Sequence, residues 1–181
     1  DEAAALSVRP YESRTNHLPQ AFNQLSYVEH RTIEFNQQKA LWRKDGFPFG
    51  LELFHPGYTA KHIISIYEIN DQKVRLIPFD ADFFNYGTNR VEIPPDFGFA
   101  GFRVVQFAKN FGEVAAFVGA SYFRMIGSRQ VYGTSARGLA LNTTASQTEE
   151  FPVFEQFWIR RPEKSSRELT VYALLDSPSA A

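Results

Sequence analysis

The chain has 181 residues, of which 44% are apolar and 22% charged, with a net charge of −1 at pH 7. This composition is typical of one soluble globular domain with a sizeable core, and it excludes an intrinsically disordered chain. The near-neutral charge provides no long-range attraction to nucleic acid, and no apolar run approaches the roughly 20 residues of a membrane-spanning helix. We therefore expect neither nucleic-acid binding nor membrane insertion.

The residues that commonly hold metals and disulfides are scarce. The absence of cysteine excludes disulfides, thiolate zinc sites and a cysteine nucleophile. The four histidines show no metal-ligand spacing, so we predict no metal and no cofactor. The chain opens with Asp1-Glu-Ala-Ala-Ala and shows no signal peptide, as a mature secreted protein would after its leader is removed.

The N-terminal quarter carries the only helical signals. Residues 1–17 are predicted to be irregular, because their alanine run is too short for a stable helix by itself. Residues 18–25 predict a short helix with Pro19 at its first position, packed against a sheet. Its apolar side is formed by Leu18, Phe22 and Leu25. Residues 27–35 predict a helical turn passing into a strand, and Trp42 is expected to anchor a loop or single turn at 39–43.

Strand signals dominate from residue 47 onward. Alternation predicts a strand at 49–54, and residues 63–69 and 73–77 predict a hairpin. Residues 79–89 are expected to form a loop or short helical turn rather than a strand. Pro94-Pro95 interrupts any regular structure.

The second half of the chain predicts a further series of strands. We expect strands at 102–107 and 113–118, the latter paired with 121–126 and followed by a strand at 139–141. Residues 157–160 and 169–175 close the series. Many short strands, with Gly and Pro between them and little helix, predict an all-β sandwich or barrel. The 18 phenylalanines and eight tyrosines suit its pleated core.

The strand predicted at 169–175 is as apolar as any in the chain. It needs partners on both sides, since an exposed apolar edge is an aggregation hazard. Either an earlier strand covers it or the chain is part of a longer polypeptide, and we expect the second.

Several segments resemble the OpgG/OpgD (MdoG/MdoD) family of periplasmic glucan biosynthesis proteins of Gram-negative bacteria. They are Asp96–Arg103 (DFGFAGFR), Gly119–Arg124 (GASYFR), Tyr132–Ala140 (YGTSARGLA), Glu149–Pro152 (EEFP) and Tyr172–Pro178 (YALLDSP). Two departures stand out, because Thr134 replaces the usual leucine and Gln147-Thr148 the usual Ser-Gly. The resemblance extends from about Pro10 to the end, and several long motifs in the same order make it specific.

The resemblance implies a fold, a location and a process. Family members are periplasmic and are needed to make osmoregulated glucans with a β-1,2-linked glucose backbone. They contain a large N-terminal β-sandwich resembling galactose mutarotase, followed by an immunoglobulin-like domain. By this resemblance, residues 18–181 would be the first part of the glucan-binding sandwich. The partners would be a β-1,2-linked glucan and the remainder of the polypeptide, with a homodimer as an open alternative.

The predicted glucan-binding residues are Tyr122, Arg124, Tyr132, Ser135, Arg137 and Glu150. Sugars bind to aromatic faces and to charged or amide groups that bond pairs of hydroxyls, and bonds with an ionised partner are about twice as strong. Arg137 lies among small residues that let a ligand approach. Tyr122 and Arg124 alternate along a strand and should face the same side. The alternatives are that Arg137 only pins a loop by pairing with Glu149 or Glu150, and that Tyr122 belongs to the core.

The sequence also offers candidates for a nucleophile, for the rim of a cleft and for a glycosylation site. Ser135 does not fit the nucleophile pattern G-x-S-x-G, because the second glycine falls one position late. Asp80 and Asp82 could form the rim of a cleft, whereas Asp176 is expected to cap a turn. Asn142-Thr-Thr144 has the form of a glycosylation acceptor, which a bacterial periplasmic protein would normally leave unused.

Two functions stay open at this point. The full protein is either a β-1,2-glucan hydrolase or a non-catalytic glucan-binding scaffold that assists backbone modification or release. Some family members are such hydrolases and act through acidic residues. The resemblance places those carboxylates beyond residue 181, so no catalytic residue is assigned.

Overall fold

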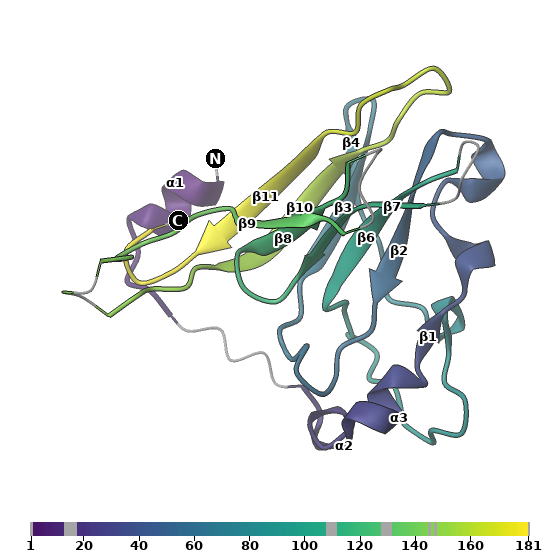
Figure 1. Cartoon of the computed structure of the whole chain (residues 1–181), viewed down its shortest axis with the longest axis horizontal. Helices are drawn as coiled ribbons and strands as arrows, with labels where there is room; N and C mark the ends of the chain where they lie inside the picture. Colours follow the sequence, from purple (N-terminus) through teal and green to yellow (C-terminus); the bar gives the residue numbers. More distant parts are fainter. Residues whose placement is uncertain are drawn as a thin grey trace.

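The longer strands form two sheets that enclose one core (Figure 1). The computed structural model describes residues 2–12, 18–107, 112–127, 132–144, 146 and 148–180. The predicted all-β fold with short helices is confirmed.

The first sheet has five antiparallel strands in the order β2-β6-β7-β8-β9. Their bounds are Phe49–Phe54 for β2, Gly101–Gln106 for β6, Gly112–Val118 for β7, Tyr122–Met125 for β8 and Thr134–Arg137 for β9. The strand predicted at 49–54 is confirmed, as are the strand near 102–107 and the pairing of the next two. This sheet carries the charged side chains Glu52, Arg103, Glu113 and Arg124 that are considered below.

The strand predicted at 139–141 is wrong. The strand that pairs with β8 is β9, and Leu141 makes only an isolated bridge to Glu150. Ser121 explains the shift, since its carbonyl accepts the Gly138 N–H at 2.7 Å and its hydroxyl donates to the Leu139 carbonyl at 3.1 Å. These bonds divert the chain at the end of β9, before the apolar run begins.

The second sheet has the order β11-β10-β3-β4. Its strands are β3 (Ser65–Asn70), β4 (Lys73–Leu76), β10 (Val153–Arg160) and β11 (Val171–Asp176). The β3–β4 hairpin is confirmed, whereas β10 starts four residues before the predicted 157 and runs parallel to β3. Within the described residues, β11 pairs only with β10 and forms an edge.

The core lies between the two sheets and is rich in phenylalanine. Phe102 of the first sheet meets Phe157 of the second edge to face, with ring centroids 5.0 Å apart. Phe117 stacks on Phe102 at 5.0 Å and on Phe123 at 5.5 Å. Leu51 and Leu53 have no exposed surface. The predicted aromatic β core is therefore confirmed.

Three short helices precede the sheets, and two predictions about them need correction. Residues 2–7 form α1 (Glu2–Ser7), which contacts β11, so tertiary contact compensates for a run too short to be helical alone. Residues from the segments 6–12 and 176–180 line one hollow there, so the described parts of the N- and C-terminal segments lie side by side (Figure 1). Residues 13–17 of the predicted irregular segment lie outside the described residues.

The second helix, α2 (Gln20–Asn23), is shorter than predicted, and Pro19 is its N-cap rather than its first residue. Leu18, Phe22 and Leu25 are buried as expected. They pack against Phe97 and loop side chains, however, and not against a sheet. The reason is that these side chains join a separate small cluster made of helix and loop residues.

The third helix, α3 (Tyr27–Arg31), is followed by the two-residue strand β1 (Glu34–Phe35), which confirms the prediction for 27–35. A capping box between Ser26 and Glu29 starts α3. Strand β1 pairs with β5 (Phe84–Asn85), so the expectation of no strand within 79–89 is wrong at those two residues.

Three single 3-10 turns complete the described elements: η1 (Gln37–Lys39), η2 (Arg43–Asp45) and η3 (Ala81–Phe83). Trp42, between the first two, is buried, and its indole N–H donates to Glu68. The predicted anchor role of Trp42 is confirmed. Among the described residues, no helix is long and apolar enough to cross a membrane.

Candidate functional site

The outer face of the five-stranded sheet carries a row of residues that crosses all five strands and is polar on four of them. Direct cross-strand partners share a face of a sheet. The row is Glu52 on β2, Arg103 on β6, Ala116 on β7, Arg124 on β8 and Ser135 on β9. The sequence places these side chains here because they alternate with core residues, for example Glu52 with Leu51 and Leu53.

Two carboxylates and two arginines along this face form a continuous ladder of ion pairs. Arg103 Nε donates to Glu52 Oε2 at 2.6 Å, and Arg103 Nη1 lies 3.7 Å from Glu113 Oε2. Arg124 Nε donates to Glu113 Oε1 at 3.1 Å. Carboxylate acceptors and guanidinium donors therefore alternate along the ladder, and a sugar hydroxyl can bond to either kind of group.

A β-bulge brings Glu113 into this ladder. Val104 pairs with Ala115 but Val105 pairs with Glu113, so β7 carries one extra residue, Val114, at this point. Bulges re-aim side chains in this way. Without the extra residue, Glu113 would alternate onto the core face of the sheet.

The two carboxylates of the ladder are more buried than its two arginines. Glu52 has no exposed surface, whereas the side chains of Arg103 and Arg124 are 31% and 50% exposed. Glu52 Oε1 is buried and has no hydrogen-bond partner among the described residues. The deep end of the ladder therefore holds an unused acceptor.

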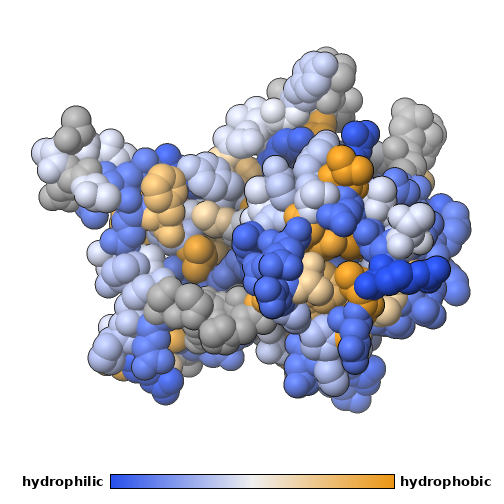
Figure 2. Space-filling view, turned by 90° about the horizontal axis from the view of Figure 1, so that it is seen from below, coloured by the Kyte–Doolittle hydropathy of each residue, from blue (hydrophilic) through white to orange (hydrophobic). Residues whose placement is uncertain are grey.

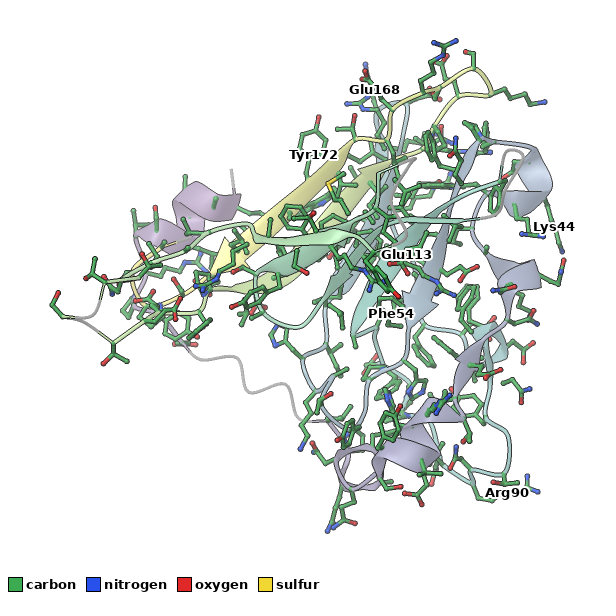
Figure 3. All side chains as sticks on the ribbon, in the orientation of Figure 1. Lys44, Phe54, Arg90, Glu113, Glu168 and Tyr172 are labelled. Atoms are coloured by element: carbon green, nitrogen blue, oxygen red, sulfur yellow. The ribbon has the colours of Figure 1, made fainter. Side chains whose placement is uncertain are left out.

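Two adjoining hollows lie over these residues, and together we call them the groove. The larger has a volume of about 1010 Å³ and is lined by residues that include Phe35, Asn36, Gln38, Glu52, Phe84 and Arg103. The smaller, of about 330 Å³, is lined by residues that include Glu113, Tyr122, Arg124 and Ser135. Phe54 and Val118 line both hollows. Figure 3 shows Phe54 and Glu113 near the middle of the molecule.

Three of the predicted site residues come together in the groove. Tyr122, Arg124 and Ser135 all line its smaller hollow, and Tyr122 and Arg124 share a face as predicted. Tyr122 is 38% exposed, so the alternative that it belongs to the core is wrong. The structure places these residues on one surface, and their binding of a glucan stays a prediction.

Arg137 lies at the margin of this surface. It pairs across strands with Tyr122, its guanidinium carbon lies 5.3 Å from that ring's centroid, and it forms an ion pair with Glu149. The hydrogen bond to Glu149 raises the pKa of Arg137. Its guanidinium also lies 5.2 Å from the Phe151 ring. Arg137 thus pins the segment around Glu149, as the alternative interpretation proposed.

Tyr132 and Glu150 are not brought to the groove. Tyr132 is 88% exposed. Glu150 accepts hydrogen bonds from the Ser179 backbone N–H at 2.9 Å and hydroxyl at 2.8 Å. Hydrogen bonds from Ser177 and Ser179 lower the pKa of Glu150. Glu150 therefore fastens the turn that follows β11, and a binding role for either residue stays a prediction.

The other carboxylates considered lie outside the groove lining. Asp80 accepts the Asp82 N–H at 2.9 Å as the cap of η3, and Asp82 pairs with Lys39 at 3.1 Å. Asp176 is buried at the end of β11. Among the described residues, no three His, Asp or Glu side chains are grouped so that they could hold a metal.

Sequence reasoning missed Glu52, Arg103 and Glu113. A signal was present for the first two, because each is the only charged residue in a strand of otherwise uncharged residues. Two lone charges of opposite sign on neighbouring strands predict a cross-strand pair. For Glu113 no such signal exists, since the bulge that re-aims it is not visible in the sequence.

Comparison with known proteins adds to this geometry. The sequence profile described as "Periplasmic glucan biosynthesis protein, MdoG" matches residues 1–181. The chain belongs to the periplasmic glucan biosynthesis protein family. The resemblance expected from the sequence motifs is thereby confirmed.

This member of the periplasmic glucan biosynthesis protein family has curated relatives that share one name. It is 44% identical to "Glucans biosynthesis protein G" of Rhodopseudomonas palustris and 41% identical to that of Bradyrhizobium diazoefficiens. It is 40% identical to the protein of the same name from Sodalis glossinidius. The matches cover 99% of this chain and 36%, 36% and 35% of the three relatives. The chain therefore spans about a third of the length of the curated relatives it matches.

Proposed function

We propose that this chain binds the β-1,2-linked glucose backbone of a periplasmic glucan in the groove on the outer face of the five-stranded sheet. Membership of the glucan biosynthesis family supports a glucan as the ligand and the periplasm as the location. The observation that carries the proposal is the ladder of Glu52, Arg103, Glu113 and Arg124 that lines the groove.

The ladder suits a polyhydroxylated chain for two reasons. Its alternating acceptors and donors can bond adjacent hydroxyls, and charged partners strengthen such bonds. The rings of Phe54 and Tyr122 lie along the same groove and offer apolar surface to the C–H faces of the sugars. Because the lining extends from β1 to β9, the groove has room for several sugar units in a row.

The same residues favour binding over cleavage in this part of the protein. A glycosidase uses two carboxyl groups about 5–9.5 Å apart, one of which must donate a proton to the leaving oxygen. Three carboxylates line the groove: Glu52 and Glu113 are bonded to arginines, and Glu34 is exposed on β1. We therefore propose that any hydrolysis or remodelling of the backbone by the full-length protein relies on carboxylates outside this segment. The alternative is a non-catalytic scaffold that holds the backbone for other enzymes.

One experiment tests the proposal and separates its two forms. The full-length protein is titrated with linear β-1,2-glucan by calorimetry, and the glucan is then incubated with the protein and sized by chromatography. Binding with shortening of the chains supports a hydrolase, and binding without shortening supports a scaffold. An absence of binding contradicts both forms.

A further inference from the structure

The deep end of the groove holds a buried carboxylate that is only half used. Glu52 lines the larger hollow and has no exposed surface. Its Oε2 atom accepts a hydrogen bond from Arg103 Nε at 2.6 Å. Its Oε1 atom is buried without a hydrogen-bond partner among the described residues. Buried polar atoms are nearly always bonded, so an unbonded one indicates a partner that the described residues do not supply.

The chemistry of this atom restricts what the partner can be. A carboxylate oxygen has no hydrogen to give, so the partner must be a donor such as a hydroxyl or an amine. An ether oxygen offers no hydrogen, and a second carboxylate would add repulsion in a buried site. The atom can therefore distinguish a free hydroxyl from the same oxygen after alkylation.

Two nearby amides do not offer an equivalent acceptor. The side-chain oxygen of Asn36 accepts the Gln38 N–H at 3.1 Å, and that of Asn85 accepts the Gly87 N–H at 3.0 Å. Both residues line the same hollow as Glu52. Their oxygens are already engaged with the backbone, whereas Glu52 Oε1 is not.

We propose that Glu52 determines specificity in the groove by accepting a hydrogen bond at Oε1 from a free hydroxyl of one glucose unit. The groove then selects a sugar unit with an unsubstituted hydroxyl at that place, and rejects a unit in which the hydroxyl is an ether or is replaced by an anionic group. This inference rests on the proposed function, since it takes the ligand to be a glucan.

The substitution Glu52→Gln tests the proposal directly. Glutamine has nearly the same shape, keeps one oxygen for Arg103 and places an amide N–H₂ donor where Oε1 was. The full-length protein is titrated with a linear β-1,2-glucan oligosaccharide and with its partly O-methylated derivative. We expect the wild-type preference for the free hydroxyls to fall by about tenfold to a hundredfold in Glu52→Gln, because a hydrogen bond to a charged group is lost.

Glu155→Gln is the matched control. Glu155 is also a buried carboxylate, and it lies 3.4 Å from His62 Nε2, but it is on β10 of the other sheet and does not line the groove. Its substitution should leave the preference between the two ligands unchanged. An equal loss of preference in both variants would overturn the proposal, because it would show a general effect of removing a buried charge.

The outcomes separate this inference from the proposed function. If the wild-type protein binds neither ligand, both are overturned. If it binds the glucan and Glu52→Gln keeps the wild-type preference, only the role of Glu52 is overturned. Circular dichroism and the unfolding midpoint establish that the variant is folded.

A second arm uses only wild-type protein, so it does not depend on the variant's stability. Oligosaccharides that carry amino or carboxylate groups in place of single hydroxyls are compared with the neutral chain. We expect an amino group at the position next to Glu52 to preserve or strengthen binding, and a carboxylate at that position to weaken it at least tenfold. Carboxylated chains that bind as well as neutral ones at every substituted position would overturn the proposal.

Discussion

At the scale of single residues, Glu52 and Arg103 form a pair of unequal burial. Glu52 has no exposed surface, whereas the Arg103 side chain still reaches solvent. Arg103 is thus the ion-pair partner that stabilises the buried carboxylate of Glu52. Glu113 makes a second contact with the same guanidinium. Breaking a buried pair from one side is far more costly than replacing the whole pair.

Arg103→Ala should therefore destabilise the protein by about 3–5 kcal/mol, because it leaves Glu52 buried without a partner. Arg124→Ala is the control, since Arg124 is half exposed and should cost less than about 1 kcal/mol. Glu113 keeps one arginine in either variant. Urea unfolding measures both values. Equal losses of unfolding free energy would contradict this account of Glu52.

His55 gives the protein a defined response to acid. Burial lowers the pKa of His55 from its usual 6.5 to about 4. Its ring lies among those of Phe22, Phe79, Phe84, Tyr86 and Phe97. Between pH 6.5 and 4 the unfolded chain binds a proton that the folded chain does not, so folding stability falls as the pH is lowered through that window.

His55→Phe should remove this part of the pH dependence. The wild-type protein should lose roughly 2–3 kcal/mol more than the variant between pH 7.5 and pH 4.5. Unfolding free energies at the two pH values give the difference. Parallel losses in wild type and variant would show that His55 is not the group responsible.

At the scale of elements, the ladder depends on close contact between β6 and β7. A Cβ atom at Gly101 would collide with the Phe117 carbonyl oxygen, a backbone atom that cannot move aside. Gly101 pairs with Phe54 on one side and Val118 on the other, both of which line the groove. The absence of a side chain therefore keeps the strands in register beneath the groove.

Gly101→Ala should destabilise the protein by about 1–3 kcal/mol or more, because the strands must shift to admit the methyl group. Gly138→Ala is the matched control, since a Cβ there would meet only the ends of the Leu175 and Phe154 side chains at 3.3 and 3.5 Å. It should change the unfolding free energy by less than about 1 kcal/mol. Thermal unfolding of the two variants checks the contrast, and a tolerated Gly101→Ala would contradict the close approach.

Local sequence patterns correctly predicted the strands whose side chains alternate. They failed where contacts with distant residues determine whether an element forms and where it ends. Alternation located β2 and the β3–β4 hairpin, since a period of two is visible in the sequence. It misplaced β9, because the hydroxyl and carbonyl of Ser121 end that strand from outside it. It missed α1, which contacts β11 at the other end of the chain.

The alternation of side chains along strands also made part of the candidate site predictable. Alternation placed Tyr122 and Arg124 on one face, and the structure adds Ser135 beside them. Tyr132 shares a sequence motif with Ser135, and Glu150 belongs to another of the family motifs, but neither residue lines the groove. Proximity in a motif does not decide which way a loop turns, and Ser179 holds Glu150 away from the groove.

At the scale of the whole molecule, the two faces of the five-stranded sheet have different roles. The inner face packs Phe102 and Phe117 against the second sheet, and the outer face carries the groove. The core thus supplies a rigid support for the polar row. Seen from below the view of Figure 1, apolar residues form separate small patches among polar ones (Figure 2). Figure 3 also labels Tyr172, which lies on β11 of the second sheet and not on the five-stranded sheet that carries the groove.

Two tyrosines give the most direct test of the claim that the groove holds a glucan. Tyr122 lines the groove and Tyr132 does not, although both are exposed and only ten residues apart. The affinity of the full-length protein for linear β-1,2-glucan is measured by calorimetry for Tyr122→Ala and Tyr132→Ala. We predict that Tyr122→Ala weakens binding by about tenfold and that Tyr132→Ala leaves it unchanged, with similar unfolding midpoints. Weaker binding in Tyr132→Ala, with wild-type affinity in Tyr122→Ala, would contradict the groove as the binding site.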